Sequence, residues 1–322
     1  MVQILGVFAP IFLITLAGYG CGRARFLGPA GATVLSRFVF FVAMPPLFFG
    51  TLARRDFAEI AHWGYLASYA VAIVAGGLAF LVLGRRVFKE SGAKLALGIF
   101  TAINGNAGYI GIPICLYAFG SPLPAILATL VHMILVYPLL ITWIELDLAR
   151  KSGKPAASVL AKIAQVFGVV LKNPLLLANF LGVAVAAAQI EIPETILRTC
   201  DLLGHGAIPA AVFTLGLTLS EKDVEDAAGG GDRREIAAAS LIKLVLIPLV
   251  AFAVGRFAFG LDAAQLGALV FVAALPSPKN AFILAQRYGV YIRRAAMTVF
   301  VTTVASAATL PLVLYLFGAQ PL

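Results

Sequence analysis

Apolar runs of nearly bilayer-crossing length dominate this sequence. A helix needs about 20 mostly apolar residues to cross the roughly 30 Å hydrocarbon core of a bilayer. Ten runs approach this length: Ile4–Gly20, Val34–Leu52, Tyr65–Leu83, Leu95–Phe119, Leu123–Ile144, Leu175–Ile190, Leu202–Leu219, Ile236–Phe259, Ala263–Tyr288 and Ala295–Phe317. With 61% hydrophobic and 12% charged residues and a mean hydropathy of +0.98, the chain is too apolar for a soluble domain. The sequence therefore predicts an all-α polytopic membrane protein with ten transmembrane helices.

The charged residues and cysteines argue against several other classes of protein. The net charge of +9 is carried by basic residues in short segments between the runs, which argues against a nucleic-acid partner. Cys21, Cys115 and Cys200 lie in or beside apolar runs, so we interpret them as buried hydrophobic residues and predict neither a disulfide framework nor a metal site. The sequence contains no paired catalytic carboxylates, nucleophile–base pair or nucleotide-binding loop, so we predict no enzymatic activity and no cofactor.

The distribution of Lys and Arg predicts how the chain lies in the membrane, because short cytoplasmic loops are enriched in these residues. With the N-terminus outside, 18 of the 24 Lys and Arg residues are cytoplasmic, and Lys243 and Lys279 lie deeper within runs. Only four face outward: Arg54, Arg55, Arg198 and Arg256. We therefore expect a multi-pass protein of the cytoplasmic (inner) membrane with both termini outside. Lys243 lies near the inner end of its run, where its ammonium group is expected to reach the interface.

The fourth run carries Asn-Gly-Asn-Ala-Gly-Tyr-Ile-Gly-Ile-Pro at its centre, from Asn104 to Pro113. Glycine and proline disfavour helix, and non-helical backbone at membrane depth is tolerated only where protein buries it or it lines a cavity. Such broken helices point to transporter binding sites. We expect Asn104 and Asn106 to bind substrate, and the helix to resume near Gly108–Ile110 with its positive dipole end toward an anion. A simple proline kink is the alternative.

The ninth run is interrupted at Pro276-Ser277-Pro278-Lys279-Asn280. A charged residue at the bilayer centre costs at least about 2.5–3.5 kcal/mol and therefore demands a partner. No Asp or Glu lies at the centre of any run, so we expect Lys279 to pair with a carboxylate of the substrate, with Ser277 and Asn280 orienting it. Lys279 is also a candidate for proton coupling, because burial favours the neutral amine. A lysine that only caps carbonyl groups at the break is the alternative.

The runs divide into two sets of five. The second and seventh runs each carry a central proline, and the fourth and ninth are the broken pair. Because five is odd, the second set must insert upside down, which is the inverted-repeat plan of secondary transporters. We expect a first repeat over 1–146, a cytoplasmic linker with a short amphipathic segment over 147–170, and an inverted repeat over 171–322. Helices four and nine would cross, with breaks or hinges at Pro45, Pro113, Pro209, Pro276 and Pro278.

Several motifs resemble the auxin efflux carrier family, whose bacterial members include malonate and malate permeases. They are Ser36–Phe40 with Ala43–Pro45, Asn104–Pro113, Lys172–Pro174, Ala207–Pro209 with Leu215–Leu217, and Leu275–Ser277. The resemblance implies ten helices in two inverted repeats, crossing helices four and nine, and transport of organic anions. The plant members carry an Asn-Pro-Asn-x-x-Tyr element that contacts the substrate carboxylate, and it matches Asn104, Asn106 and Tyr109. Gly105 stands where that element has proline, so the resemblance does not imply auxin as the substrate.

We expect a secondary active transporter that moves a small mono- or dicarboxylate by alternating access, independently of sodium and with proton coupling left open. A sodium-coupled symporter resembling the bile acid transporter group is the alternative. His205, and with less weight His132, are further candidates for proton coupling, because histidine titrates near neutral pH and an ionisable group within a span is a functional candidate. The expected partners are the carboxylate and membrane lipid, with a homodimer left open. The acid, the direction of transport and the coupling ion stay open.

Overall fold

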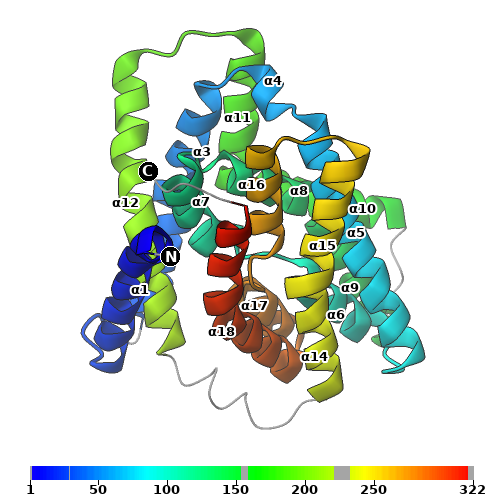
Figure 1. The fold of residues 1–322 in the computed structure, drawn as a ribbon. Coiled ribbons are helices and arrows are strands. Elements are labelled where there is room, and N and C mark those ends of the chain that lie inside the picture. The colour runs from blue at the N-terminus through cyan, green and yellow to red at the C-terminus, as the bar shows by residue number, and fades with distance from the viewer. Residues whose placement is uncertain (1, 29, 154–158, 221–232, 318–322) are drawn as a thin grey trace.

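The described part of the chain is helical throughout. The computed structural model describes residues 2–28, 30–153, 159–220 and 233–317, and these form helices and turns without a strand (Figure 1). Seven of its helices are long and apolar enough to cross a membrane: Gly31–Ala53, Phe57–Arg86, Gly92–Phe119, Leu123–Lys151, Glu194–Thr218, Arg233–Ala258 and Ile292–Leu316. Three further helices are rich in apolar residues: α1 (Val2–Arg23), α11 (Pro174–Ala188) and α16 (Ala263–Ala273). The prediction of an all-α chain with several membrane-spanning helices is confirmed, and the number of ten transmembrane helices stays a prediction.

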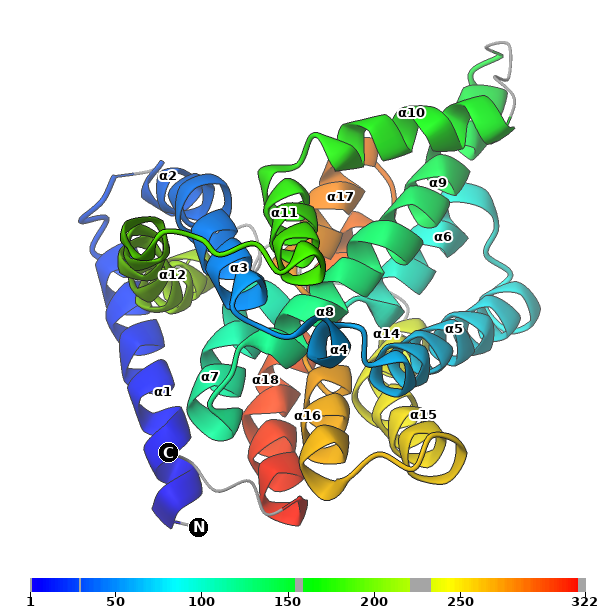
Figure 2. The same cartoon turned by 90° about the horizontal axis from the view of Figure 1, so that it is seen from above.

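Five helices form one packed group. α12 (Glu194–Leu219) packs along α1 and α3 (Met44–Ala53), and α11 packs along α3. α2 (Gly31–Phe38) continues into α3 through a π-helical turn, η1 (Val39–Ala43), and also contacts α12. Figure 2 shows α1, α2, α3 and α12 together on one side of the molecule, with α11 nearer the middle of the view. We name α1, α2, α3, α11 and α12 the scaffold group.

The other long helices form a second group. Its contacts join α5 (Trp63–Arg86) to α6 (Gly92–Ile103) and α15 (Ile247–Ala253), α6 to α9 (Tyr137–Lys151), and α17 (Lys279–Tyr288) to α18 (Ile292–Leu316). It also contains α16 and these elements: η2 (Ala107–Gly111), α7 (Ile112–Phe119), α8 (Leu123–Val131), η3 (His132–Val136), α14 (Arg233–Leu241), η4 (Ile242–Leu246) and η5 (Val254–Ala258). We name this set the crossing group. The short helix α4 (Phe57–Ile60) precedes α5.

The segment predicted as a linker, residues 147–170, is mostly helical where it is described. α9 extends to Lys151, beyond the predicted boundary at residue 146, and α10 (Val159–Leu171) packs against α9 and α11. Residues 154–158, in the middle of this segment, lie outside the described residues. The predicted amphipathic segment falls mostly on α10.

Two helices are broken inside the segments that the sequence predicted. α6 ends at Ile103 and helix resumes at Ala107, slightly before the predicted restart, while Pro113 lies beyond the break. The second break separates α16, which ends at Ala273, from α17, which begins at Lys279. Each half of one broken helix contacts one half of the other: α17 packs against α6, and α16 packs against α7. The broken helices therefore meet at their breaks.

Hydrogen bonds join the two breaks directly. The backbone N–H of Asn106 donates to the Pro276 carbonyl oxygen at 2.8 Å. The Ser277 hydroxyl donates to the Thr101 carbonyl oxygen at 2.7 Å, and its backbone N–H donates to the Thr302 hydroxyl at 3.1 Å. Backbone groups that the breaks free from their helices are thus satisfied within the protein, as they must be at membrane depth.

Four prolines each follow a π-helical turn. η1 ends two residues before Pro45, η2 two residues before Pro113, and η3 and η4 two residues before Pro138 and Pro248. Proline has no N–H and its ring crowds the carbonyl four residues earlier, so a wider preceding turn relieves both problems. Pro209 differs, because it lies within the uninterrupted helix α12. The two predicted hinges, Pro45 and Pro209, therefore have different local backbones.

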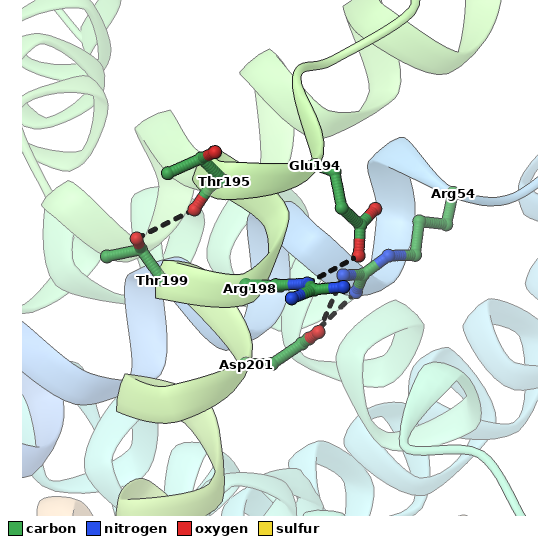
Figure 3. A network of polar contacts seen from close by, with 6 residues as sticks. All are labelled: Arg54, Glu194, Thr195, Arg198, Thr199 and Asp201. Carbon is green, nitrogen blue, oxygen red and sulfur yellow. Dashed lines mark hydrogen bonds and ion pairs between the residues drawn. The ribbon is translucent and has the colours of Figure 1, made fainter.

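At one end of the scaffold group an ion pair joins α3 to α12. Arg54, which follows α3, donates from Nη1 and Nη2 to the two carboxylate oxygens of Asp201 at 2.8 and 2.7 Å (Figure 3). Glu194 accepts from Arg198 one turn away, at 3.2 Å. The Arg54 and Asp201 side chains are 38% and 43% exposed, so the pair contributes at most about 1 kcal/mol. Its bidentate geometry nevertheless fixes how these two helix ends align.

α1 and α12 approach each other so closely that their backbones touch. A Cβ atom on Gly18 would lie 2.1 Å from the Phe213 carbonyl oxygen, and one on Gly216 would lie 2.0 Å from the Thr15 carbonyl oxygen. Small residues at such crossings let membrane helices pack backbone against backbone. Glycine is therefore required at both positions.

Gly18→Val is expected to force α1 away from α12 and to destabilise the protein by about 1–3 kcal/mol, as overpacking does. The measurement is the melting temperature of the detergent-purified protein. Gly20→Val is the matched control, because no atom lies within 4 Å of the Cβ position on Gly20. Equal melting temperatures for the two variants would contradict the close packing of α1 on α12.

Candidate functional site

A cavity of about 310 Å³ lies between the scaffold group and the two breaks. Its wall on the scaffold side is formed by Ala32, Thr33, Ser36, Arg37, Phe40, Met44, Asn173, Leu175, Thr214, Leu215 and Thr218. Its wall on the crossing side is formed by Asn104, Gly105, Asn106, Ala107, Gly108, Tyr109, Thr129, His132, Met133, Tyr137, Pro278, Lys279, Asn280 and Ile283. The cavity thus extends from the first turns of α2 and α11 to the point where the broken helices meet.

Most of the predicted substrate-binding residues line this cavity: Asn104, Asn106, Tyr109, Lys279 and Asn280. Ser277 does not line it. Its side chain is fully buried, and its hydroxyl donates to the Thr101 carbonyl between the breaks. The geometry therefore places Ser277 behind the cavity wall, where it ties the two breaks together.

Asn106 caps the helix that resumes after the first break. Its Oδ1 accepts a hydrogen bond from the Tyr109 backbone N–H at 3.3 Å, and the residue is 5% exposed. Its Nδ2 makes no hydrogen bond within the described part of the chain, so both N–H groups of this amide are available to a ligand. Most backbone N–H groups at this restart already have acceptors: Ala107 donates to the Gly105 carbonyl oxygen at 2.8 Å, and Tyr109 donates to Asn106. The first break therefore presents the Asn106 amide to the cavity as a hydrogen-bond donor.

Tyr137 connects one asparagine from each break. The Asn104 Nδ2 donates to the Tyr137 hydroxyl at 3.3 Å, and the Asn280 side chain is close enough to interact with the same hydroxyl. The Tyr137 ring packs edge-on against Phe100, with ring centroids 5.0 Å apart. Tyr137 was not among the predicted binding residues. The sequence feature that could have identified it is a tyrosine directly before Pro138 inside an apolar run.

The charges around the cavity are positive. Lys279 is the half-buried first residue of α17, and Arg37 lies on the opposite wall. None of the described lining residues carries a carboxylate. The N-terminal ends of η2 and α17 add the positive partial charge of helix N-termini. An anion is therefore the ligand that this lining suits.

Two threonines on the scaffold wall were also missed by sequence reasoning. Thr214 and Thr218 lie four residues apart near the end of α12, so they occupy one face of the helix. The sequence feature that could have identified them is a pair of hydroxyl residues at helical spacing within an apolar run. The Thr214 hydroxyl already donates to the Ala210 carbonyl oxygen at 2.6 Å, so Thr218 is the one of the two that can donate to a bound anion.

The two candidate histidines lie in different surroundings. His205 is exposed on α12 and does not line the cavity. His132 lines it and is 3% exposed, with Nδ1 2.9 Å from the Ala128 carbonyl oxygen and Nε2 3.3 Å from the Ile103 carbonyl oxygen. A neutral imidazole has one N–H and can donate to only one of these oxygens, whereas an imidazolium can donate to both.

The prediction that Lys243 reaches the membrane interface is wrong. Its side chain is fully buried, and Nζ donates to the carbonyl oxygen of Ala273 at 3.0 Å. The physical reason is that Lys243 lies on η4, which packs against α5, α6 and α18. The side chain therefore points to the end of α16 at the second break. Groups of three or more His, Cys, Asp or Glu that would hold a metal ion are absent from the residues that the structure describes.

Comparison with known proteins identifies the family. The sequence matches the family described as "Membrane transport protein" over residues 3–314. A Rhizobium meliloti (strain 1021) protein named "Putative malonate transporter" is 28% identical, covering 100% of this chain and 98% of that protein. The uncharacterized transporter YfdV of Escherichia coli (strain K12) is 27% identical, covering 97% of this chain and 96% of that protein.

A plant protein links the chain to the predicted resemblance. The rice (Oryza sativa subsp. japonica) protein named "Probable auxin efflux carrier component 5a" is 27% identical over 43% of this chain and 38% of its own length. The resemblance to the auxin efflux carriers is confirmed, and the family and these relatives are transporters, not enzymes. This chain belongs to the membrane transport protein family, the family of the auxin efflux carriers.

Proposed function

We propose that this protein is a secondary active transporter that moves a small mono- or dicarboxylate across the cytoplasmic membrane by alternating access, without sodium. The observation that carries the proposal is the cavity at the meeting point of two broken helices, where the charged lining residues, Arg37 and Lys279, are both basic. A volume of about 310 Å³ is near the lower end of the usual range for ligand pockets, about 300–1,000 Å³. That size fits a small acid.

The proposal assigns ten spans to the chain. α1, α2–α3, α5, α6–α7 and α8–α9 would form the first repeat, and α11, α12, α14–α15, α16–α17 and α18 the second, inverted one. Two observations support this pairing. The first two spans of each set belong to the scaffold group, and the fourth span of each set is the broken one. Inverted repeats with broken helices at their interface are a recurrent plan of secondary transporters.

The orientation and the motion follow from the same division. With the N-terminus outside, the ends of α2, α11 and α12 that line the cavity are cytoplasmic, so the described conformation would admit substrate from the cytoplasm. Alternating access would rock the crossing group against the scaffold group, and the cavity lies between the two. Lys279 and His132 line the cavity and are the groups to test for proton coupling, whereas His205 faces away from it.

Uptake of radiolabelled malonate into proteoliposomes tests the proposal, since the Rhizobium meliloti relative is named as a malonate transporter. We expect saturable uptake that other short carboxylates compete with and that persists when choline replaces sodium. Empty liposomes are the control. Uptake that requires sodium would support the sodium-coupled alternative. A folded protein that neither binds nor moves any short mono- or dicarboxylate would contradict the proposal.

Asn106→Ala is expected to weaken carboxylate binding by about 1.5–3 kcal/mol, because it removes hydrogen-bond donors to a charged group. The measurement is isothermal titration of the purified protein with malonate. Asn179→Ala is the matched control: Asn179 is a fully buried amide on α11 that donates to the Leu175 carbonyl and does not line the cavity. Wild-type affinity in folded Asn106→Ala would remove this residue from the proposed site.

A further inference from the structure

A buried lysine lies directly behind the cavity wall. Lys243 Nζ lies 3.4 Å from the position that a Cβ atom on Gly105 would occupy, and Gly105 itself lines the cavity. The hydrogen bond of this ammonium goes to the Ala273 carbonyl oxygen, and no carboxylate of the described residues forms an ion pair with it. An ammonium group in a low-dielectric interior is costly unless negative charge compensates it.

The ends of two half-helices provide that negative charge. Ala273 is the last residue of α16, and Gly105 follows the last residue of α6, Ile103, by two positions. Each helix C-terminus carries about half an elementary negative charge. Two such ends beside one ammonium group approximately balance it. In other transporters, C-terminal ends of half-helices and unwound carbonyl groups coordinate the coupling cation.

A second observation marks the same place as a cation site. The Tyr69 hydroxyl, from α5, lies 3.7 Å from the same Cβ position on Gly105. It is fully buried and has no hydrogen-bond partner in the part of the chain that the structure describes. An ammonium group has three N–H donors, and the bond to Ala273 uses one of them. A hydroxyl oxygen without a hydrogen-bond partner therefore lies near a cation that has donors to spare.

Basic side chains lie at the C-terminal ends of both half-helices at the breaks. Lys243 donates to Ala273 at the end of α16, and the Nε2 of His132 faces the Ile103 carbonyl at the end of α6. His132 is close enough to interact electrostatically with Lys243, and its ring lies edge-on to Tyr69 with centroids 5.7 Å apart. These groups form one polar layer: His132 itself lines the cavity, and Gly105 lies between Lys243 and the cavity.

We propose that the Lys243 ammonium is a resident cation of this transporter. It occupies the place at the meeting point of the half-helices that a separate coupling cation would take, and its charge acts on the bound anion across Gly105. Lys243 touches no substrate and is therefore a positioning residue. The proposal rests on the proposed function only in taking the substrate to be an anion.

The cation dependence of two variants tests the proposal. Lys243→Ala opens a space beside the Ala273 carbonyl oxygen and near the Tyr69 hydroxyl. In choline chloride, we expect this variant to lose malonate uptake by about tenfold or more, because a nearby charge in a low-dielectric site is removed. Ammonium, potassium or sodium chloride at the same ionic strength should raise both its uptake and its melting temperature. The wild type, whose site is filled, should respond to none of these cations.

The Lys243→Met variant distinguishes the loss of charge from the loss of side-chain volume, because methionine fills the site without a charge. It should lose uptake to the same extent as Lys243→Ala, and none of the added cations should restore that uptake. Val245→Ala is the control, since Val245 is exposed on the same turn, η4. Lys243→Ala that folds only with ammonium or an alkali cation would also support the proposal.

Three results would overturn the proposal: wild-type uptake in Lys243→Met, a folded Lys243→Ala that no cation affects, or a wild type that needs an added cation. If the wild type moves no carboxylate, the proposed function fails. In that case, the melting temperatures of Lys243→Ala in the different cations still test the proposal about Lys243.

Discussion

Lys279→Ala is expected to lower carboxylate affinity by about one to two orders of magnitude, more than any other single substitution in the cavity. A hydrogen bond to a charged group contributes about 1.5–3 kcal/mol, and each 1.4 kcal/mol is a factor of about ten in affinity. The Lys279 ammonium group belongs to the first turn of α17, so its charge adds to the positive end of that half-helix. Isothermal titration with malonate at low salt measures the loss.

Two further variants show whether the charge of Lys279 is responsible. Lys279→Arg should restore part of the affinity, because it keeps the charge but has a different shape and donor geometry. Ile283→Ala, one turn later on α17, removes an apolar side chain from the same wall and should change the affinity by only a few-fold. Wild-type affinity in a folded Lys279→Ala protein would mean that this lysine only caps carbonyl groups at the break and does not bind the substrate.

The breaks were predictable because few residue types stop a helix, and they are visible in a sequence. Gly105 with two flanking asparagines, and two prolines around Ser277, mark the two non-helical segments within apolar runs. The restart at Ala107 was placed too late, because the Asn106 side chain caps the helix there. Propensity alone does not show which asparagine becomes the cap.

The effect of each proline was not predictable from its own position. Pro45, Pro113 and Pro138 follow π-helical turns, whereas Pro209 lies in a continuous α-helix. A wider turn changes which side chains face the neighbouring helices, so its formation depends on packing as well as on local sequence. Sequence analysis therefore treated Pro45 and Pro209 as equivalent, and their backbones differ.

Contacts between distant segments explain the rest of the difference between prediction and structure. Lys243 bonds to a carbonyl 30 residues away, and Tyr137 to an asparagine 33 residues away. A local pattern places Lys243 near the end of an apolar run, which suggests the interface, but it does not give the direction of the side chain. Lys279 was placed on the cavity from sequence alone because it directly follows a break, and the break sets its surroundings.

A crosslink between Arg55→Cys and Ser121→Cys is expected to abolish transport. Arg55 follows α3 of the scaffold group, Ser121 lies in the turn between α7 and α8 of the crossing group, and the Arg55 Nη2 donates to the Ser121 hydroxyl at 3.4 Å. This contact lies at the opposite end of the α2–α3 helix from the cavity residues Ala32 and Thr33. Holding it closed should prevent the two groups from separating there. A bifunctional thiol reagent with a reducible linker, in a background without native cysteines, provides the crosslink.

Gly50→Cys, in a background that keeps Cys200 and lacks the other two native cysteines, supplies a matched crosslink inside one group. A Cβ atom on Gly50 would lie 3.3 Å from the Cβ of native Cys200, close to the separation of about 3.5–4.5 Å found in disulfides. That disulfide would join α3 to α12 within the scaffold group, so uptake of malonate should continue after it forms. The Arg55–Ser121 crosslink should stop uptake, and a reductant should restore it. If uptake continues through both crosslinks, the scaffold and crossing groups do not separate at this end, and the moving boundary must lie between other helices.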